Sequence, residues 1–199
     1  MNKKLAIFGC GGHAKSVADV VLHNQPNREI VFIDKNARPN EKIFNAPVFT
    51  TYNVDDCDVF IAIGDNRERK LLCEMHYANL ICVISNTAYI GKEVRIGKGV
   101  FIAHSVHIGP LTTIDDFCVL NTSASVNHEC HIGKATTVAP GALLCGNVHV
   151  GRYAWIGAGA IVRQQLTISN DVMIGCGAVV VENCDDSGTY LGIPAKINK

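Results

Sequence analysis

A histidine followed directly by a glutamate, His128-Glu129, is the pair in this sequence best suited to proton transfer. An imidazole has an ordinary pKa of about 6.5, so it can act as a general base at neutral pH. A neighbouring carboxylate can accept a hydrogen bond from one ring nitrogen, which fixes the tautomer and raises the basicity of the other nitrogen. His128 is therefore a candidate catalytic base. On the residues alone, an ordinary surface histidine is the alternative.

Four more histidines occur in the same half of the chain, at His104, His107, His131 and His149. Zinc is often held by several imidazoles, so these residues also need an interpretation. His131 and His149 are eighteen residues apart, but the spacing supplies no third partner for them. We expect solvated histidines and no metal ion, with a contact to substrate as the alternative.

A glycine-rich turn near the N-terminus could approach a phosphate. Gly9, Gly11 and Ala14 follow a short apolar segment and precede a helical pattern, and Asp34 ends the next apolar segment. Glycines at the start of a helix let a phosphate reach the backbone N–H groups. A dinucleotide needs two such halves, and only about eighty residues precede the repeat described below. We expect a single nucleotide here, with a purely structural turn as the alternative.

The composition excludes several other classes of protein. Lys plus Arg and Asp plus Glu both number 18, which argues against nucleic-acid binding. No apolar run approaches the roughly 18 residues of a membrane-spanning helix, and the first residues lack the features of a signal peptide. The nine cysteines include no C-x-x-C pair, which is typical of a reducing compartment. We therefore expect a cytoplasmic protein with no membrane insertion and no nucleic-acid partner.

A six-residue repeat occupies the second half of the chain. From Ile84 to Val180, every sixth residue is isoleucine, leucine or valine, with no break in the register. The position two residues earlier is mostly small, and glycine often follows the aliphatic residue. A period of six fits neither an α-helix nor an ordinary strand, so it predicts short strands joined by tight corners, with glycine supplying unusual dihedral angles. His128 comes two residues after the inward Val126, so it is expected near a corner, facing outwards.

The first eighty residues show a different organisation. Apolar segments alternate with helical patterns, which predicts a small parallel sheet with helices. The expected strands are residues 4–8, 29–34, 47–49 and 59–63, and the expected helices begin after the glycine-rich turn and cover about 66–76.

The repeat resembles the hexapeptide-repeat family, whose fold is a left-handed parallel β-helix with three strands per coil. Seventeen repeats would then make five to six coils without an inserted loop. The whole chain resembles the PglD- and NeuD-type bacterial sugar acetyltransferases of that family, and most closely the PglD branch. The similarity lies in residues 9–15, 61–66 with Arg69, the repeat, and 192–196. It implies an α/β nucleotide-sugar-binding domain at 1–83, half of a Rossmann-like fold, and a β-helix acyltransferase domain at 84–199.

The resemblance also implies roles for individual residues. It makes His128 and Glu129 catalytic and Gly146 an oxyanion donor. It implies acetyl-CoA contacts at Ala158, Cys176 and Thr137, although the family has a histidine where this chain has Thr137. The substrate-binding residues that it implies are Gly11, Gly12, His13, Asp34, Lys35, Gly64 and Asn121.

The function implied is an acetyl-CoA-dependent N-acetyltransferase. Its acceptor would be the amine of a nucleotide-linked 4-amino sugar, with UDP as the expected nucleotide, in the biosynthesis of a bacterial surface glycan. The family also implies a homotrimer with active sites between subunits. Two alternatives stay open, namely O-acetylation of a sialic acid and a non-catalytic subunit that binds a nucleotide sugar.

Overall fold

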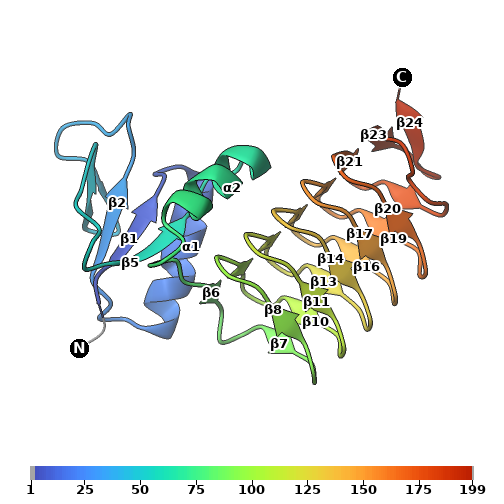
Figure 1. Ribbon diagram of the computed structural model, residues 1–199, viewed down its shortest axis with the longest axis horizontal. Helices are drawn as coiled ribbons and strands as arrows, with labels where there is room; N and C mark the ends of the chain where they lie inside the picture. Colours follow the sequence, from blue (N-terminus) through green and yellow to red (C-terminus); the bar gives the residue numbers. More distant parts are fainter. Residues whose placement is uncertain (1–2, 199) are drawn as a thin grey trace.

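The computed structural model describes residues 3–198 and contains an α/β part followed by a β-helix (Figure 1). The α/β part lies at the left in Figure 1, and the coils of the β-helix stack away from it towards the C-terminus. Within residues 3–198, neither helix has the length and the apolarity needed to cross a lipid bilayer.

A five-stranded sheet forms the centre of the α/β part, in the order β3-β4-β2-β1-β5. The pairings β1–β2, β1–β5 and β2–β4 are parallel, and β3 pairs antiparallel with β4. The predicted parallel sheet is confirmed, but the edge strand β3 was not predicted. The turn that joins β3 to β4 contains Phe44 and Asn45, with φ values of 49° and 65°, and of these two residues only asparagine is typical of such a turn. The strands are Leu5–Phe8 (β1), Ile30–Ile33 (β2), Lys42–Ile43 (β3), Ala46–Phe49 (β4) and Asp58–Ile61 (β5).

Two helices flank this sheet, α1 (Gly12–Asn24) and α2 (Asn66–Met75). Helix α1 buries one apolar face, which includes Val17 and Val20. Helix α2 starts where the Asp65 side chain accepts hydrogen bonds from two backbone N–H groups of the first turn, the usual role of an N-cap.

Three sheets form the sides of the left-handed β-helix, with successive strands along the chain passing from one sheet to the next. All their strand pairs are parallel except β23–β24 at the C-terminal end, which is antiparallel. The first sheet contains β6 (Val83–Ile84), β9 (Phe101–Ile102), β12 (Val119–Leu120), β15 (Thr137–Val138), β18 (Trp155–Ile156), β21 (Val172–Ile174), β23 (Gly188–Leu191) and β24 (Lys196–Asn198). The second contains β7 (Tyr89–Ile90), β10 (His107–Ile108), β13 (Ser125–Val126), β16 (Leu143–Leu144), β19 (Ile161–Val162) and β22 (Val179–Val180). The third contains β8 (Arg95–Ile96), β11 (Thr113–Ile114), β14 (His131–Ile132), β17 (His149–Val150) and β20 (Thr167–Ile168).

The predicted register is confirmed. Each strand from β6 to β22 ends on one of the periodic aliphatic residues, and these side chains are buried inside the coils from Ile102 onwards. In the first coil the corresponding side chains are less covered, and Ile90 is 38% exposed, because no earlier coil lies against it. The small position also points inwards and includes the buried cysteines Cys118, Cys130 and Cys184.

The glycines that follow the aliphatic residues have a different purpose from the predicted one. The left-handed backbone conformation lies two residues further on, at every corner from Glu93 to Gly177, and most residues there are not glycine. The earlier glycines instead leave room for the next coil, since a Cβ on Gly109 would lie 2.5 Å from the backbone nitrogen of His128. Close approach between coils, and not an unusual dihedral angle, requires glycine at these positions.

Candidate active site

His128 and Glu129 occupy the corner between β13 and β14. Their side chains are 58% and 56% exposed, and the Nδ1 atom of His128 lies 2.9 Å from Oε2 of Glu129. The carboxylate thus engages one ring nitrogen and leaves Nε2 available to a ligand. This geometry is that of a base held by an orienting carboxylate, on the outer surface of the coil.

The two neighbouring coils hold this corner from both sides. The backbone N–H of Glu129, which has a left-handed φ of 59°, donates to the carbonyl of Pro110 at 3.0 Å. From the following coil, the N–H of Asn147 donates to the carbonyl of His128 at 2.8 Å. The side chain of Asn127 donates to the carbonyl of Leu144 at 2.8 Å. The backbone beneath the imidazole is therefore held by hydrogen bonds to both neighbouring coils.

Gly146 lies directly beneath the imidazole, at the equivalent corner of the next coil. A Cβ built on Gly146 would come within 2.4 Å of both Cε1 and Nε2 of His128. The backbone N–H of Gly146 makes no hydrogen bond to any group in residues 3–198. The residue with this free N–H thus packs against the ring of the candidate base, and a free backbone N–H can serve as a donor to an oxyanion.

The other histidines of the repeat lie outside this corner. His131 and His149 are neighbours on β14 and β17, and their rings meet edge to face with centroids 6.4 Å apart. Asp115 lies 3.1 Å from Nε2 of His131. Within residues 3–198, no group of three or more histidine, cysteine, aspartate or glutamate side chains is arranged to hold a metal ion.

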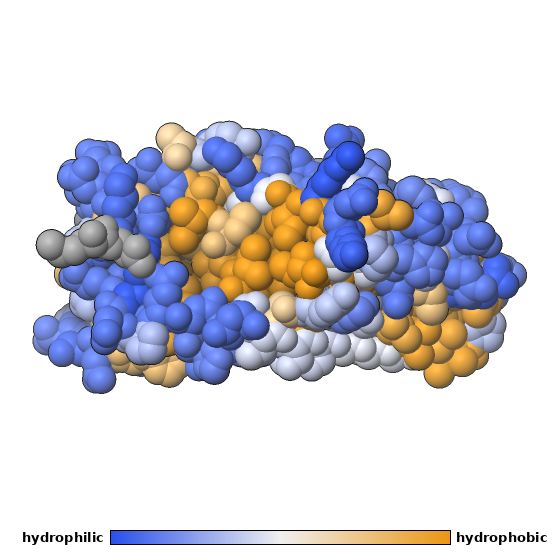
Figure 2. All heavy atoms as spheres, turned by 90° about the horizontal axis from the view of Figure 1, so that it is seen from below, coloured by the Kyte–Doolittle hydropathy of each residue, from blue (hydrophilic) through white to orange (hydrophobic). Residues whose placement is uncertain are grey.

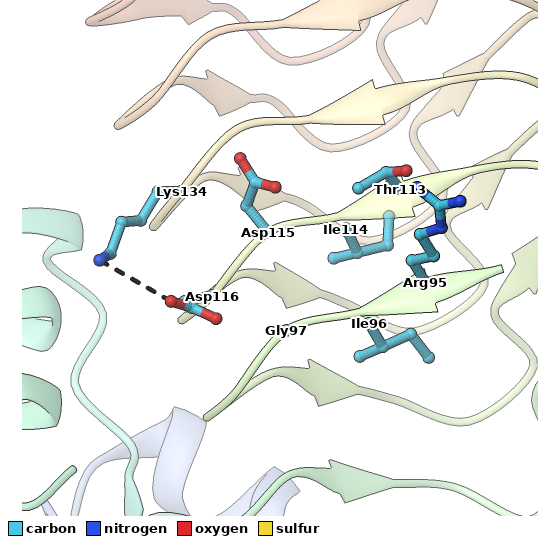
Figure 3. Close-up of a pocket in the computed structure, with 8 residues that line it drawn as sticks. All are labelled: Arg95, Ile96, Gly97, Thr113, Ile114, Asp115, Asp116 and Lys134. Carbon is cyan, nitrogen blue, oxygen red and sulfur yellow. Dashed lines mark ion pairs between the residues drawn. The ribbon is translucent and has the colours of Figure 1, made fainter.

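A shallow hollow of about 380 Å³ lies on the third sheet, next to Asp115 (Figure 3). Its floor is formed by β8 and β11, and Lys134 and Asp116 close one side with an ion pair of 3.8 Å. Positive and negative side chains alternate around it, so it offers neither a uniform anion site nor a cation site.

The residues predicted to bind a nucleotide gather at one edge of the α/β sheet. Gly11 and Gly12 precede and begin α1, Asp34 and Lys35 follow β2, and Gly64 follows β5. Because these strands are parallel, their carboxyl ends meet where ligands of such sheets bind. Gly11, Gly12, Lys35 and Gly64 are exposed there.

The Asp34 carboxylate already has backbone partners. Its two oxygens accept hydrogen bonds from the backbone N–H groups of Cys10 at 3.1 Å and Asn36 at 2.9 Å. These bonds, the one from Asn36 above all, lower the pKa of Asp34. Asp34 therefore ties the glycine-rich turn to the end of β2, and only its remaining acceptor capacity is open to a ligand.

His13, in the first turn of α1, points its side chain towards the β-helix. Its ring meets Phe101 of β9 edge to face at 5.2 Å, and its buried Nε2 atom has no hydrogen-bond partner within residues 3–198. Burial, together with the positive charge of Arg69, lowers the pKa of His13 to about 4. His13 is therefore a neutral side chain at physiological pH, able to exchange a hydrogen bond with a substrate but not to carry a charge.

We expect His13 to make the protein less stable in mild acid. Unfolded, this imidazole takes up a proton at its ordinary pKa of about 6.5, whereas the folded value is about 4. The unfolded state then binds more protons between these two values, so the free energy of unfolding falls as the pH is lowered through that window. Urea unfolding at pH 7 and pH 4.5 tests this, because His13→Gln should lose less stability than the wild type. An equal loss in both proteins would contradict it.

The residues predicted to contact acetyl-CoA fall in two places. Ala158 and Cys176 occupy equivalent corners of successive coils, between the first and the second sheet, and Asn121 lies on the same edge of the β-helix. His128 lies on another edge, between the second and the third sheet. Within a single chain, the candidate base and the predicted coenzyme surface therefore lie on different edges of the β-helix.

The prediction for Thr137 does not agree with its placement. Thr137 is 3% exposed, and its hydroxyl donates to Oδ1 of Asn66 at 2.7 Å. The side chain is thus enclosed between α2 and β15, where a coenzyme cannot reach it. The prediction for Thr137 came from the resemblance to the family, and the burial of one outward-facing residue by a helix 71 residues away has no local signal.

Sequence reasoning also missed the supporting role of Asn127. The position after an inward aliphatic residue is usually small in this repeat, and here it is an asparagine immediately before His128. That departure from the repeat was the signal by which the supporting role of Asn127 could have been predicted.

Comparison with known proteins agrees with this architecture. Residues 4–76 match the protein family described as the PglD N-terminal domain. The acetyltransferase domain of PglB from Neisseria gonorrhoeae is 32% identical over 99% of this chain and 100% of that chain, with a TM-score of 0.92, and it is also known in complex with acetyl coenzyme A.

Two further structures of similar proteins cover the whole fold. A point mutant of GDP-perosamine N-acetyl transferase from Caulobacter crescentus, in complex with CoA and GDP-perosamine, is 33% identical over 98% of this chain and 97% of that chain, with a TM-score of 0.89. WeeI from Acinetobacter baumannii is 28% identical over 98% of this chain and 99% of that chain, also with a TM-score of 0.89. The chain belongs to the PglD-type family of hexapeptide-repeat sugar N-acetyltransferases.

Proposed function

We propose that this enzyme transfers the acetyl group of acetyl-CoA to the amine of a nucleotide-linked 4-amino sugar, in the biosynthesis of a bacterial surface glycan. The observation that carries the proposal is the His128–Glu129 pair, with its imidazole packed closely against Gly146 of the next coil. A base beside an oxyanion donor is what the attack of an amine on a thioester requires. The Caulobacter relative, which takes GDP-perosamine, supports the class of acceptor.

In this mechanism Nε2 of His128 removes a proton from the amine as its nitrogen attacks the thioester carbonyl. Glu129 holds Nδ1 and stabilises the imidazolium that forms. The N–H of Gly146 donates to the oxygen on which negative charge develops. When the tetrahedral intermediate collapses, the C–S bond breaks and the CoA thiolate leaves, and it can take up the proton that His128 holds.

We assign the binding of the two substrates to different parts of the chain. Residues 1–83 would hold the nucleotide, which we take to be UDP, through Gly11, Gly12, His13, Asp34, Lys35 and Gly64. Residues 84–199 would carry out acyl transfer, with the acceptor sugar reaching past Asn121 and the pantetheine passing Ala158 and Cys176. The exposed glycines at the edge of the sheet support the first assignment, because a diphosphate can approach their backbone closely.

We further place the enzyme in the cytoplasm. All nine of its cysteines are unpaired, including the exposed Cys176. Free thiols persist in a reducing compartment, which supports this placement.

The active enzyme is expected to be a homotrimer. The candidate base and the predicted coenzyme surface lie on different edges of one chain, so a neighbouring copy is needed to bring them together. Apolar residues gather on the face shown in Figure 2. Large hydrophobic side chains are also exposed on the second sheet, where Tyr89 is 60% and Ile161 40% exposed. Exposed apolar surface of this kind is typical of subunit contacts. Sedimentation equilibrium at micromolar concentration should give three times the 21.5 kDa chain mass, and a monomer would contradict the prediction.

A substrate screen tests the proposed function directly. Purified protein with acetyl-CoA would be offered UDP- and GDP-linked 4-amino sugars, and thiol release would be followed. We expect turnover with at least one of them and none with the matching 4-hydroxy sugars. Turnover with sialic acid alone would indicate O-acetylation, and the absence of turnover with every acceptor would favour a non-catalytic binding subunit.

A further inference from the structure

Arg69 of α2 is a buried cation without a carboxylate partner. It is 1% exposed, and it forms no ion pair within residues 3–198. On the α/β side, its Nη1 atom donates to the carbonyls of Ile63 and Gly64, both at 3.1 Å. On the β-helix side, Nε donates to the carbonyl of Phe117 at 2.9 Å. A single side chain thus joins the turn after β5 to the coils.

The remaining nitrogen of Arg69 completes a buried network. Nη2 donates to Oδ1 of Asn66 at 2.6 Å, to the carbonyl of Ala135 at 3.2 Å and to the hydroxyl of Thr137 at 3.2 Å. Asn66 in turn donates from Nδ2 to the carbonyl of Tyr153 at 3.2 Å, and its Oδ1 also accepts the hydroxyl of Thr137. Every polar group of the network has a partner, so the network defines one arrangement of the two parts.

The acceptors on the β-helix form a regular ladder. Phe117, Ala135 and Tyr153 lie eighteen residues apart at equivalent corners of three successive coils, and all three have a left-handed φ between 56° and 64°. Arg69 binds the carbonyls of the first two corners, and Asn66 binds that of the third. A planar guanidinium fork suits this geometry, because it can donate in several fixed directions at once, whereas a lysine ammonium is a compact point charge.

We propose that Arg69, together with Asn66 and Thr137, is a positioning device for the nucleotide-linked acceptor. By holding the carbonyls of Ile63 and Gly64 against the coils, it fixes the nucleotide-binding edge relative to the β-helix surface on which the sugar must react. This proposal rests on the proposed function. An apolar side chain could fill the same space without the cost of burying a charge, so what Arg69 contributes is geometry. A displacement of about 1 Å at a reacting centre can lower a rate by roughly 10²-fold.

The test compares the Michaelis constants of the two substrates in Arg69→Lys. The acceptor is the UDP- or GDP-linked 4-amino sugar that the wild type turns over fastest. We expect KM for this sugar to rise at least about tenfold and KM for acetyl-CoA to stay within about twofold, since the coenzyme surface lies on the coils alone. A merely structural role would lower the folded fraction, so kcat would fall while both KM values stayed unchanged, and that result would overturn the proposal.

A second variant and a control keep the test decisive. Thr137→Val removes one buried hydroxyl at nearly constant volume and should raise KM for the sugar about threefold, even if Arg69→Lys does not fold. Arg67→Gln breaks an exposed ion pair with Asp171 across the same junction and should leave both KM values unchanged. Unchanged KM for the sugar in Thr137→Val would overturn the positioning role alone. A wild type that acetylates no amino sugar would instead contradict the proposed function on which this role depends.

Discussion

Replacing His128 by alanine is expected to lower kcat by roughly 10²–10⁴, the usual contribution of a general base. The side chain is 58% exposed and lies outside the inward register, so its loss should barely change the free energy of unfolding. KM for acetyl-CoA should stay nearly constant, because the predicted coenzyme surface lies on another edge of the β-helix. Steady-state kinetics of thiol release, with thermal unfolding of the same preparations, would measure both effects.

Two matched variants identify the source of this loss. Glu129→Gln keeps the size of the side chain but removes its charge, and it should lower kcat less than His128→Ala, since Glu129 acts only through the imidazole. His131→Ala changes an exposed histidine three residues away that pairs with Asp115, and it should remain close to wild type. A large loss in His131→Ala with none in His128→Ala would identify His131 as the base. Wild-type rates in both His128→Ala and His131→Ala would mean that the enzyme positions an amine that is already neutral.

Replacing Gly146 by alanine is expected to lower kcat by roughly 10²-fold through the position of the imidazole. A Cβ at this site would lie 2.4 Å from Nε2 of His128, so the ring must swing away. The backbone N–H of residue 146 survives the substitution, so the proposed oxyanion donor remains present. Because the half-exposed ring can move into solvent, the melting temperature should change little while turnover falls.

A double-mutant cycle separates the position of the ring from any other role of Gly146. In a His128→Ala background no imidazole lies over residue 146, so adding Gly146→Ala should have almost no further effect on the residual rate. Strict additivity of the two losses would show that the methyl group interferes with the substrate or with the oxyanion instead of with His128. The cycle needs only kcat values measured at saturating acetyl-CoA.

Much of the fold could be predicted from the sequence because the pattern behind it is local. An inward aliphatic residue at every sixth position, from Ile84 to Val180, requires the same short strand and the same corner each time. The position of His128 relative to Val126 then placed its side chain on the outside. The glycines were misinterpreted, since a sequence cannot distinguish a glycine needed for its dihedral angles from one needed for space, as at Gly109.

The candidate site also has features that the sequence predicts and features that it does not. The adjacency of His128 and Glu129 is a property of the sequence, and neighbouring residues at a corner can meet without any help from the rest of the fold. The contact of His128 with Gly146 depends on the stacking of coils eighteen residues apart, which the repeat made predictable once three strands per coil were assumed. The buried, neutral state of His13 could not be foreseen, because Phe101 comes to it from a distant part of the chain.

By itself, then, the sequence determined the β-helix, its register and the outward position of the candidate pair His128 and Glu129, since each follows from a pattern within a few residues. Only the tertiary structure decided how the α/β part sits on the coils, and with it the contacts of Thr137 and Arg69. Thr137 meets Asn66 across 71 residues, and Arg69 meets Phe117 across 48. Such contacts depend on how two separately formed surfaces fit together, and their hydrogen bonds are directed mostly at backbone carbonyls, which every residue has and no side-chain pattern reveals.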